Sequence, residues 1–531
     1  MGSHHVAKFH CRSWSEPPWR GWRRTFWAPA RKLVLGLWLT LACQSALAQA
    51  MYRIKPIGDL PGGCGPMAHG FNGSDQVTGD TCNANGDSHA FLWTNNGTPM
   101  LDLGPHIVGS SSYAYALNAS GVVAGYARDI SFEAPGSAFK SSGQGAPMTR
   151  FFDSLGGNEI TPFAMNDLGQ LAGQADTASA THAFFLKNNS SPVLDLGTLG
   201  GANSYAYAIN ASGRVAGAAD LPGNSGSHAF VWKNDGTPMR DLGTLGGDSA
   251  GYFINAAGQI AGDSYLRNGA THAFFWRNDG TPMQDLGPLA ETYVEPNGLN
   301  DAGQIAVTTG INNPQAYVWL NDGTGLKNLG DLSGNASAAS DINSSGQVTG
   351  LAYLAGSSVS HAFLWRNDGT NMQDLNKLID PTDPLKPYVT LTRGVFINDR
   401  SHIVAEGTDS RTGLEGVYLL EGTGLTASVL TLAPRALAFG NQPINTFSAA
   451  QSVTVTNTSA KAVAITGIAL RGMAPGQFAF TDDCGQSLAA HATCTLKASF
   501  KPTTKGAKTA FLDVNGGGGG LRSVKLTGTG T

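Results

Sequence analysis

The chain has 531 residues, of which 70 are glycine, about twice the usual share of roughly 7%, and only 14% are charged, against roughly 25% in an average soluble protein. The hydrophobic share of 41% is enough to build a large core, which excludes a disordered or highly charged polymer. This composition favours all-β structure with many turns, and the length allows two or more domains.

Residues 1–48 are predicted to be a secretory signal peptide. They contain seven basic residues and one acid, then an apolar run from Leu33 to Ala42, then the small residues Ala46 and Ala48 at the −3 and −1 positions of a cleavage site. The run is shorter than the roughly 20 apolar residues that cross a bilayer. A lipoprotein attached at Cys43 and a buried N-terminal helix are the alternatives, and the order of the basic, apolar and small parts favours the signal peptide.

Removal of residues 1–48 leaves 27 basic and 37 acidic residues, a net charge of about −10. We therefore expect a secreted, extracellular or periplasmic protein with no nucleic-acid partner, because phosphate binding needs clustered Lys and Arg. No second apolar span follows, so no integral membrane span is expected. Four cysteines remain, Cys64, Cys82, Cys484 and Cys494, and an even number in an exported chain predicts disulfides.

One sequence element recurs eight times, at intervals of 43 to 55 residues. It consists of an apolar residue, Asn, two further residues, usually Gly, then an apolar pair and usually a second Gly. Its asparagines are Asn72, Asn118, Asn166, Asn210, Asn255, Asn300, Asn343 and Asn398. Units continue with His-Ala-Phe-x-Trp, with Asn-Asp-Gly-Thr-Pro-Met or a close variant, and with Asp-Leu-Gly.

Each unit is predicted to fold as four short strands, which are Ala-Tyr-Ala-Ile, Arg-Val-Ala-Gly, His-Ala-Phe-x-Trp and Met-x-Asp-Leu in the clearest copies. Asn-x-x-Gly and Asn-Asp-Gly supply the tight turns between them. Four strands in roughly 40–45 residues is the period of a β-propeller blade. A β-helix would need shorter rungs, and a helical solenoid would need a period of about 3.6 residues.

These units resemble the HAF repeat of bacterial extracellular proteins, which is named for its His-Ala-Phe triplet. The resemblance covers about residues 52–425, where the triplet, the Asn-x-x-Gly turn and Asp-Leu-Gly recur in order. It implies secretion and a β-propeller, and it implies no established activity. The chain departs from the pattern at Ser137, Gln315 and Glu415, which replace the His, and at Val307 and Ala405, which replace the second Gly.

The loops of the repeat form a constant and a variable class. From Asn to the second Gly position is always seven residues, and from the Trp to the Met position is seven residues in the first seven units. The segment between the second and third strands and the unit-to-unit connection vary in length, and propeller geometry places both at the opposite end. Variable loops on a fixed scaffold commonly carry binding, so this variable end is expected to bind a protein or a glycan.

The eighth unit, which contains Asn398, has no Asp-Leu-Gly strand after it. Residues 52–60 are predicted to supply that strand and to close the ring, which removes the exposed sheet edges. This predicts a propeller of eight blades over residues 49–425, with seven blades as the alternative if one weak unit drops out. Cys64 and Cys82 would both lie at the variable end, where a disulfide can join them.

After a linker at residues 426–432, residues 433–531 are predicted to form an immunoglobulin-like β-sandwich, since seven short alternating segments occur in about 100 residues. The segment resembles the choice-of-anchor D and abnormal-spindle/SPD-2/hydin class of domains. The matching marks are Leu437-Ala-Phe-Gly440, Val453-Thr-Val-Thr-Asn457, Cys484 and Cys494, Phe500-Lys-Pro502 and Leu526-Thr-Gly-Thr-Gly530. The resemblance implies a stalk or adapter, and we expect Cys484 and Cys494 to form a disulfide.

Histidine recurs at one position in five units and is the first candidate for chemistry. It could form a ring of metal ligands or bases, or it could be structural and bond between strands or to the Asn-Gly turn. Repetition favours the structural role, because equivalent atoms of neighbouring blades are too far apart to share one zinc at roughly 2 Å. The histidines are His89, His182, His228, His272 and His361, and the aspartates of Asp-Leu-Gly, interpreted as strand-end turn residues, are Asp102, Asp195, Asp241, Asp285 and Asp374.

No residue is predicted to be catalytic, to bind a cofactor or to bind a metal. The chain lacks Gly-x-Ser-x-Gly, His-Glu-x-x-His and a phosphate-binding glycine loop. Acids at the variable end could bind calcium or serve as glycosidase carboxylates, and tyrosines there could stack on sugars, but the spacing selects no pair. These residues are Asp80, Asp129, Glu133, Asp220 and Asp263, with Tyr126, Tyr265, Tyr293 and Tyr388.

The sequence therefore predicts an exported, monomeric, non-enzymatic binding scaffold. The alternative is a propeller-type glycan-active hydrolase or lyase with a site near the central channel. Three or more carboxylates or histidines converging at the channel would favour the enzyme. A channel lined by the small first-strand alanines would count against it.

Overall fold

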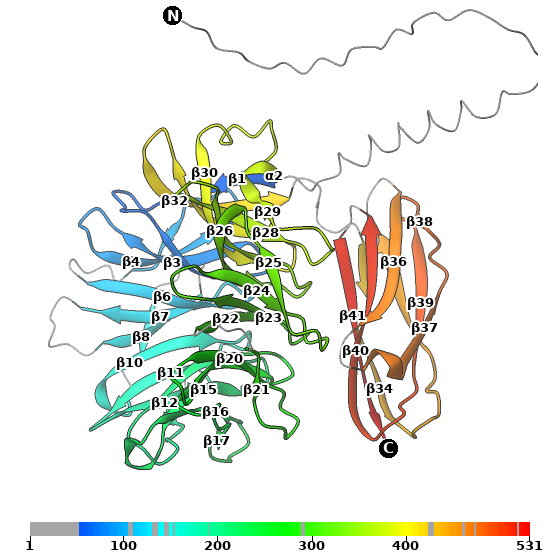
Figure 1. Ribbon diagram of the computed structural model, residues 1–531, viewed down its shortest axis with the longest axis horizontal. Coiled ribbons are helices and arrows are strands. Elements are labelled where there is room, and N and C mark those ends of the chain that lie inside the picture. Colours follow the sequence, from blue (N-terminus) through cyan, green and yellow to red (C-terminus); the bar gives the residue numbers. More distant parts are fainter. Residues whose placement is uncertain are drawn as a thin grey trace, which may run out of the picture. The chain divides into compact units, whose positions relative to one another are not determined.

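A computed structural model of the chain (Figure 1) describes residues 52–531 without 105–109, 130–135, 143–147, 152–153, 189–190, 288–292, 423–429, 459–461, 472–473 and 518–519. These residues are almost entirely strand, with one short helix, α2 (Leu375–Leu378), and two 3-10 turns, η2 (Pro222–Asn224) and η3 (Pro475–Gln477). The expected signal peptide lies outside the described residues. No helix of the described part is long and apolar enough to cross a membrane.

The repeat region forms a β-propeller whose described residues make eight four-stranded antiparallel sheets. The first sheet contains β2 (Met67–Phe71), β3 (Gln76–Cys82), β4 (Ser88–Thr94) and β5 (Leu101–Asp102), and the second contains β6 (Ser111–Leu117), β7 (Val123–Arg128), β8 (Ser137–Ser141) and β9 (Thr149–Phe151). The third contains β10 (Gly156–Met165), β11 (Leu171–Thr177), β12 (Thr181–Leu186) and β13 (Leu194–Asp195). The fourth contains β14 (Ser204–Ile209), β15 (Val215–Asp220), β16 (Ser227–Trp232) and β17 (Arg240–Asp241).

The next four sheets repeat this order. They are β18 (Ser249–Ile254), β19 (Ile260–Tyr265), β20 (Thr271–Trp276) and β21 (Gln284–Asp285); β22 (Val294–Leu299), β23 (Ile305–Thr309), β24 (Gln315–Trp319) and β25 (Leu326–Gly330); β26 (Ser333–Ile342), β27 (Val348–Leu354), β28 (Ser360–Trp365) and β29 (Gln373–Asp374); and β30 (Val389–Ile397), β31 (Ile403–Asp409), β32 (Leu414–Gly422) and β1 (Tyr52–Pro56).

The eighth sheet joins the two ends of the propeller sequence. As expected from the missing fourth strand, β1 pairs antiparallel with β32, with Tyr52 opposite Gly422 and Ile54 opposite Leu420. Each first strand lies beside the first strand of the next sheet, and β30 lies beside β2. The first strands therefore form a closed circle.

Two glycine-dependent features shape most of these sheets. The Asn-x-x-Gly turn closes with a hydrogen bond from the Gly N–H to the Asn carbonyl, at 3.1 Å for Gly121 and Asn118. The second Gly of the repeat lies opposite a bulge in the first strand. A Cβ atom at Gly217 would lie 1.9 Å from the Tyr205 carbonyl oxygen, so only glycine fits there.

The sheets pack face to face through aromatic side chains of the third strands. Phe230 and Phe274 are fully buried. The ring of Phe185 in β12 contacts Trp232 in β16 at a centroid distance of 5.1 Å, and Phe275 contacts Trp319 at 4.8 Å. Phe274 and Trp276, at the Phe and Trp positions of the fifth sheet, share one core cluster with Val231 of the fourth, so these positions hold neighbouring sheets together.

Residues 430–531 form a second, separate structure of two facing sheets. One contains β33 (Leu430–Ala433), β35 (Gln451–Asn457), β39 (Thr493–Phe500) and β37 (Phe478–Asp482), and the other contains β34 (Ala436–Gln442), β41 (Gly520–Gly530), β40 (Gly506–Gly517), β36 (Val463–Arg471) and β38 (Ser487–Leu488). Both sheets contribute to one core, for example through Val453, Leu496, Leu512 and Leu526.

The start of this sandwich differs from the sequence expectation. Residues 430–432 were expected in the linker, but they belong to β33, which pairs with β35. Leu430 and Leu432 alternate into the core, which explains why this short segment forms a strand. Residues 426–429 of the expected linker lie outside the described residues.

Phe274→Ala should destabilise the propeller by about 3–5 kcal/mol, because it removes a fully buried ring and leaves a cavity between sheets. Urea unfolding followed by tryptophan fluorescence would measure the loss. Leu168→Ala, in a turn where the side chain is 72% exposed, is the control and should change stability by less than about 0.5 kcal/mol. Equal effects of the two substitutions would contradict the packing described above.

Candidate functional site

Seven of the eight repeated asparagines link their own sheet to the next. Asn210 Oδ1 accepts hydrogen bonds from the N–H groups of Ser212 and Arg214 in its own turn. Its Nδ2 donates to the carbonyl oxygen of Asn255 in the following sheet at 3.0 Å. The same side chain-to-backbone bond is formed at 2.9–3.3 Å by Asn72, Asn166, Asn255, Asn300, Asn343 and Asn398. The asparagine therefore serves the ring as well as its own turn.

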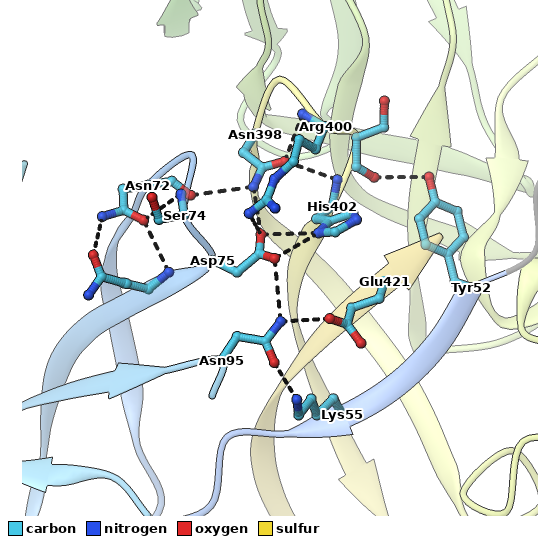
Figure 2. Close-up of polar contacts among 12 residues, drawn as sticks. Tyr52, Lys55, Asn72, Ser74, Asp75, Asn95, Asn398, Arg400, His402 and Glu421 are labelled. Atoms are coloured by element: carbon cyan, nitrogen blue, oxygen red, sulfur yellow. Dashed lines mark hydrogen bonds and ion pairs between the residues drawn. The ribbon is translucent and has the colours of Figure 1, made fainter. Parts of the chain in front are cut away.

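The junction between the eighth and the first sheet has an additional polar cluster (Figure 2). Most repeat units have Gly three residues after the Asn, but here Asp75 occupies that position with a φ of 59°. Asp75 is 3% exposed. Its Oδ1 accepts from Asn398 Nδ2 at 2.9 Å, lies 3.0 Å from His402 Nδ1, and lies 2.7 Å from a guanidinium nitrogen of Arg400.

The charges at this junction between the eighth and the first sheet, called the seam below, favour the ionised carboxylate of Asp75. Burial by itself would raise the pKa of Asp75, but the hydrogen bond and charge of His402, together with the charge of Arg400, outweigh it and hold the pKa below its ordinary value. Asn95 adds a bond from its Nδ2 to Asp75 Oδ2 at 3.3 Å and another to Glu421 Oε1 at 2.6 Å. These polar contacts join the first sheet to the last and stabilise the closed ring.

Each repeated histidine binds the aspartate of Asp-Leu-Gly in its own sheet. The Nδ1 atom lies 2.9–3.1 Å from a carboxylate oxygen in the pairs His89–Asp102, His182–Asp195, His228–Asp241, His272–Asp285 and His361–Asp374. In the first pair the carboxylate also accepts from Gly104 N–H at 2.7 Å, and His89 Nε2 lies 3.0 Å from Asn83 Nδ2. The pair ties the third strand to the turn after the fourth, which supports the structural interpretation of both residues.

A ring of bulged residues is the feature that the sequence does not reveal directly. In every first strand the register skips one residue, and that residue stands three positions before the repeat Asn. The skipped residues are His69, Tyr115, Phe163, Tyr207, Tyr252, Asn297, Ser340 and Val395. The sequence signal for this ring is a position that differs from unit to unit and is flanked by small residues in most units.

The alanines that precede the bulges of β6 and β14 are buried, whereas the bulged residues themselves are partly exposed. Ala114 and Ala206 are fully buried, whereas Tyr115 and Tyr207 are partly exposed. The extra residue of each bulge redirects the side chains, so the larger residue is the one left accessible.

The acidic and aromatic candidates are placed in separate local contacts. Asp80 pairs with His69 at 2.7 Å, and Asp129 pairs with Arg150 at 2.9 Å. Three further residues are bonded in the same local way: Asp220 accepts from Asn203, Tyr126 donates to Glu159, and Tyr293 donates to Glu295. Tyr265 is exposed, Tyr388 lies under the guanidinium of Arg411 at 4.8 Å, and Glu133 lies outside the described residues.

Asp263 lies in an environment that opposes its ionisation. Burial, together with the charge of Glu295, raises its pKa to about 6, and the hydrogen bond from Tyr252 only partly offsets this. Tyr252 is a member of the bulge ring. The sequence named Asp263 only as one of five acids and did not show which neighbours it has.

The two loop classes of the variable end lie together. Ala202, in the connection between β13 and β14, donates its N–H to Asn224 in the β15–β16 loop at 2.8 Å. The disulfide Cys64–Cys82 joins the same two loop classes in the first sheet, and Cys484–Cys494 forms in the sandwich. Both expected cysteine pairs are thus at disulfide distance.

Most of the exposed large apolar side chains of the described propeller lie at this end. Of the eight large ones, six lie in or beside the variable loops: Met67, Tyr265, Ile311, Val359, Tyr388 and Leu414. The other two, Leu168 and Leu194, do not. Accumulation of apolar groups on one part of a surface is typical of an interaction site.

No protein-family model matches the chain, and no curated protein matches it. Solved structures are similar to it at low identity. They include TolB from Acinetobacter baumannii (14% identity over 57% of this chain and 70% of that one, TM-score 0.31) and the β-propeller domain of the Trilobed protease from Pyrococcus furiosus (10% identity, 59% and 96%, TM-score 0.39). A third is the ASH/PapD-like domain of human CEP192 (13% identity, 20% and 86%, TM-score 0.16).

These likenesses carry no information on activity. The description of the propeller rests on its strand pairings, and the resemblance of the repeat to the HAF family and of the C-terminal region to the choice-of-anchor D class stays a prediction. The chemistry of the chain has to be inferred from its own residues.

Asp75→Gly should destabilise the propeller by about 3–5 kcal/mol at pH 7, because it leaves His402 and Arg400 without their buried partner while keeping a residue suited to positive φ. Since the folded-state pKa of Asp75 is lowered, its contribution is full above the unfolded pKa of roughly 3.9 and is lost as the pH falls below that value. The difference from the parent chain should therefore shrink between pH 7 and pH 3 in urea unfolding.

Asp279→Gly is the matched control, because Asp279 is exposed in a turn, where its carboxylate accepts hydrogen bonds from Thr281. It should cost no more than about 1 kcal/mol. A stability difference for Asp75→Gly that is small, or the same at both pH values, would rule out the seam as an electrostatic lock.

Proposed function

We propose that the chain is an exported, non-enzymatic binding scaffold that presents the variable end of an eight-bladed propeller to a protein or a glycan. The carrying observation is the accumulation of six exposed apolar side chains among loops that differ from blade to blade. The opposite end repeats the same Asn-x-x-Gly turns and keeps little freedom to vary.

The remaining parts of this proposal follow from the same architecture. Residues 1–48 act as the signal peptide, and the two disulfides fit a secreted or periplasmic chain because such bonds persist in oxidising compartments. The C-terminal module is an immunoglobulin-like stalk or adapter, and the chain acts as a monomer. Pairing with β1 leaves β32 without a free edge that would recruit a second copy.

A second candidate function is a glycan-active hydrolase or lyase with its site inside the ring of first strands. The observation that favours it is Asp263, whose pKa of about 6 suits a general acid near neutral pH and which lies within the influence of Glu295. The binding scaffold is preferred because the histidine–aspartate pairs are distributed one to a sheet and serve the strands.

Binding to a glycan array and to surface proteins of the producing cell, each with the secreted full chain, would test the loop end. The triple variant Ile311→Ser, Val359→Ser, Leu414→Ser should lose at least tenfold in affinity for any ligand found, since it removes three exposed apolar side chains from the loops. Leu168→Ser, at the constant end, should bind like the parent chain.

Retention of affinity by the triple variant would place binding elsewhere. Absence of any ligand, combined with cleavage of a polysaccharide panel that Asp263→Asn abolishes, would replace the scaffold by the enzyme. Circular dichroism of each variant checks that the fold is kept.

A further inference from the structure

The bulge ring gives the inside of the propeller a composition of its own. All eight side chains come from equivalent positions, three residues before the repeat Asn. Four consecutive sheets place an aromatic residue there, whereas the other four place His69, Asn297, Ser340 and Val395. One half of the ring is therefore aromatic and the other half is small or polar.

The four aromatic side chains touch one another from sheet to sheet. Ring centroids are separated by 6.1 Å between Tyr115 and Phe163, by 6.2 Å between Phe163 and Tyr207, and by 5.3 Å between Tyr207 and Tyr252. Tyr205 stacks on Tyr207 at 6.4 Å. All of these side chains are partly exposed, so solvent reaches the aromatic arc.

The arc ends at two carboxylates. Asp263 accepts a hydrogen bond from Tyr252, eleven residues earlier, and its charge also acts on Tyr207. Glu295, from the next sheet, accepts from Tyr293 Oη at 2.9 Å and repels Asp263 electrostatically. These two groups therefore belong to one local environment.

No cationic side chain among the described residues forms an ion pair with Asp263 or Glu295. Their hydrogen bonds come from neutral tyrosine hydroxyls. The site thus combines the negative faces of tyrosine rings with two uncompensated carboxylates, and both features attract positive charge. This differs from the seam, where Asp75 already has His402 and Arg400.

We propose that the side chains of Tyr207, Tyr252, Asp263 and Glu295 form a binding site for an organic cation, an alkylammonium or guanidinium group. The rings contact the group and its apolar stem, and the carboxylates neutralise its charge. A neutral sugar could stack on the rings, but it would leave the two carboxylates uncompensated. The site is independent of the variable loops, so it is a second binding site and does not rest on the function proposed for them.

A fluorescein-labelled tetra-arginine peptide and spermidine are suitable probes for the two sources of such a group, a basic peptide and a polyamine. Both are tested with the full chain at 150 mM salt, by fluorescence anisotropy for the peptide and by calorimetry for spermidine. Saturable binding of at least one probe is expected. Asp263→Asn and Tyr207→Leu should each weaken that binding at least tenfold.

Asp235→Asn is the matched control for charge, because it removes the same charge from an exposed turn outside the ring. It should leave binding unchanged, as should the triple loop variant described above. Thermal unfolding of each variant verifies folding, and Tyr207→Leu keeps the test decisive if Asp263→Asn does not fold.

Two results would overturn the proposal. One is an equal loss of affinity for Asp263→Asn and Asp235→Asn, which would indicate general attraction to an acidic protein. The other is binding of maltohexaose, used as a neutral sugar probe, without binding of either cation, which would identify the arc as a glycan site. Failure of the loop-end experiment would not affect either outcome.

Discussion

The structure depends on a single amide group repeated around the ring. An asparagine side chain has both an acceptor and donors, so Asn210 can satisfy two N–H groups of its own turn and still donate to Asn255 of the next sheet. Aspartate could accept but could not donate, and serine could not span both partners. The spacing between neighbouring sheets and the shape of each turn are consequently set by the same residue. Apolar packing between Phe and Trp rings supplies most of the burial, but it lacks this directional link.

At the seam, charged side chains add to the link between neighbouring sheets. The last sheet has His402 and Arg400 near its turn, and both pair with Asp75 of the first sheet, which stands where most other units have Gly. A buried ion pair adds little net stability, because desolvation of the charges offsets their attraction, but it distinguishes the correct neighbour from any other sheet. The seven other junctions need no such distinction, since the chain itself dictates which sheet comes next. The seam is where the order of sheets has to be recognised by side chains.

Much of this architecture could be predicted from the sequence because the repeat encodes it locally. The Asn-x-x-Gly turn, the second Gly and the His-Ala-Phe-x-Trp strand reveal four strands and their burial, and the missing last strand reveals the role of Tyr52 to Pro56. The pairing of His89 with Asp102 was not evident, since both residues have plausible local partners in their own turns. The bulge was also hidden, because no residue type marks the position at which the strand register skips. Proximity of Asp263 to Glu295 depends on two sheets and cannot be read from either unit.

The seam also has a consequence for the order of events during folding. The strand that is synthesised first, β1, pairs with β32, one of the last parts of the propeller to be made. Most sheets can form from contiguous residues as these are synthesised. The eighth sheet cannot be completed until β32 has been made, and β1 has to stay unpaired until then. Closure is therefore a late, long-range step that requires an intact chain. A truncated or nicked product would retain folded sheets and expose an unsatisfied strand edge, which gives a quality-control system a clear signal of incompleteness.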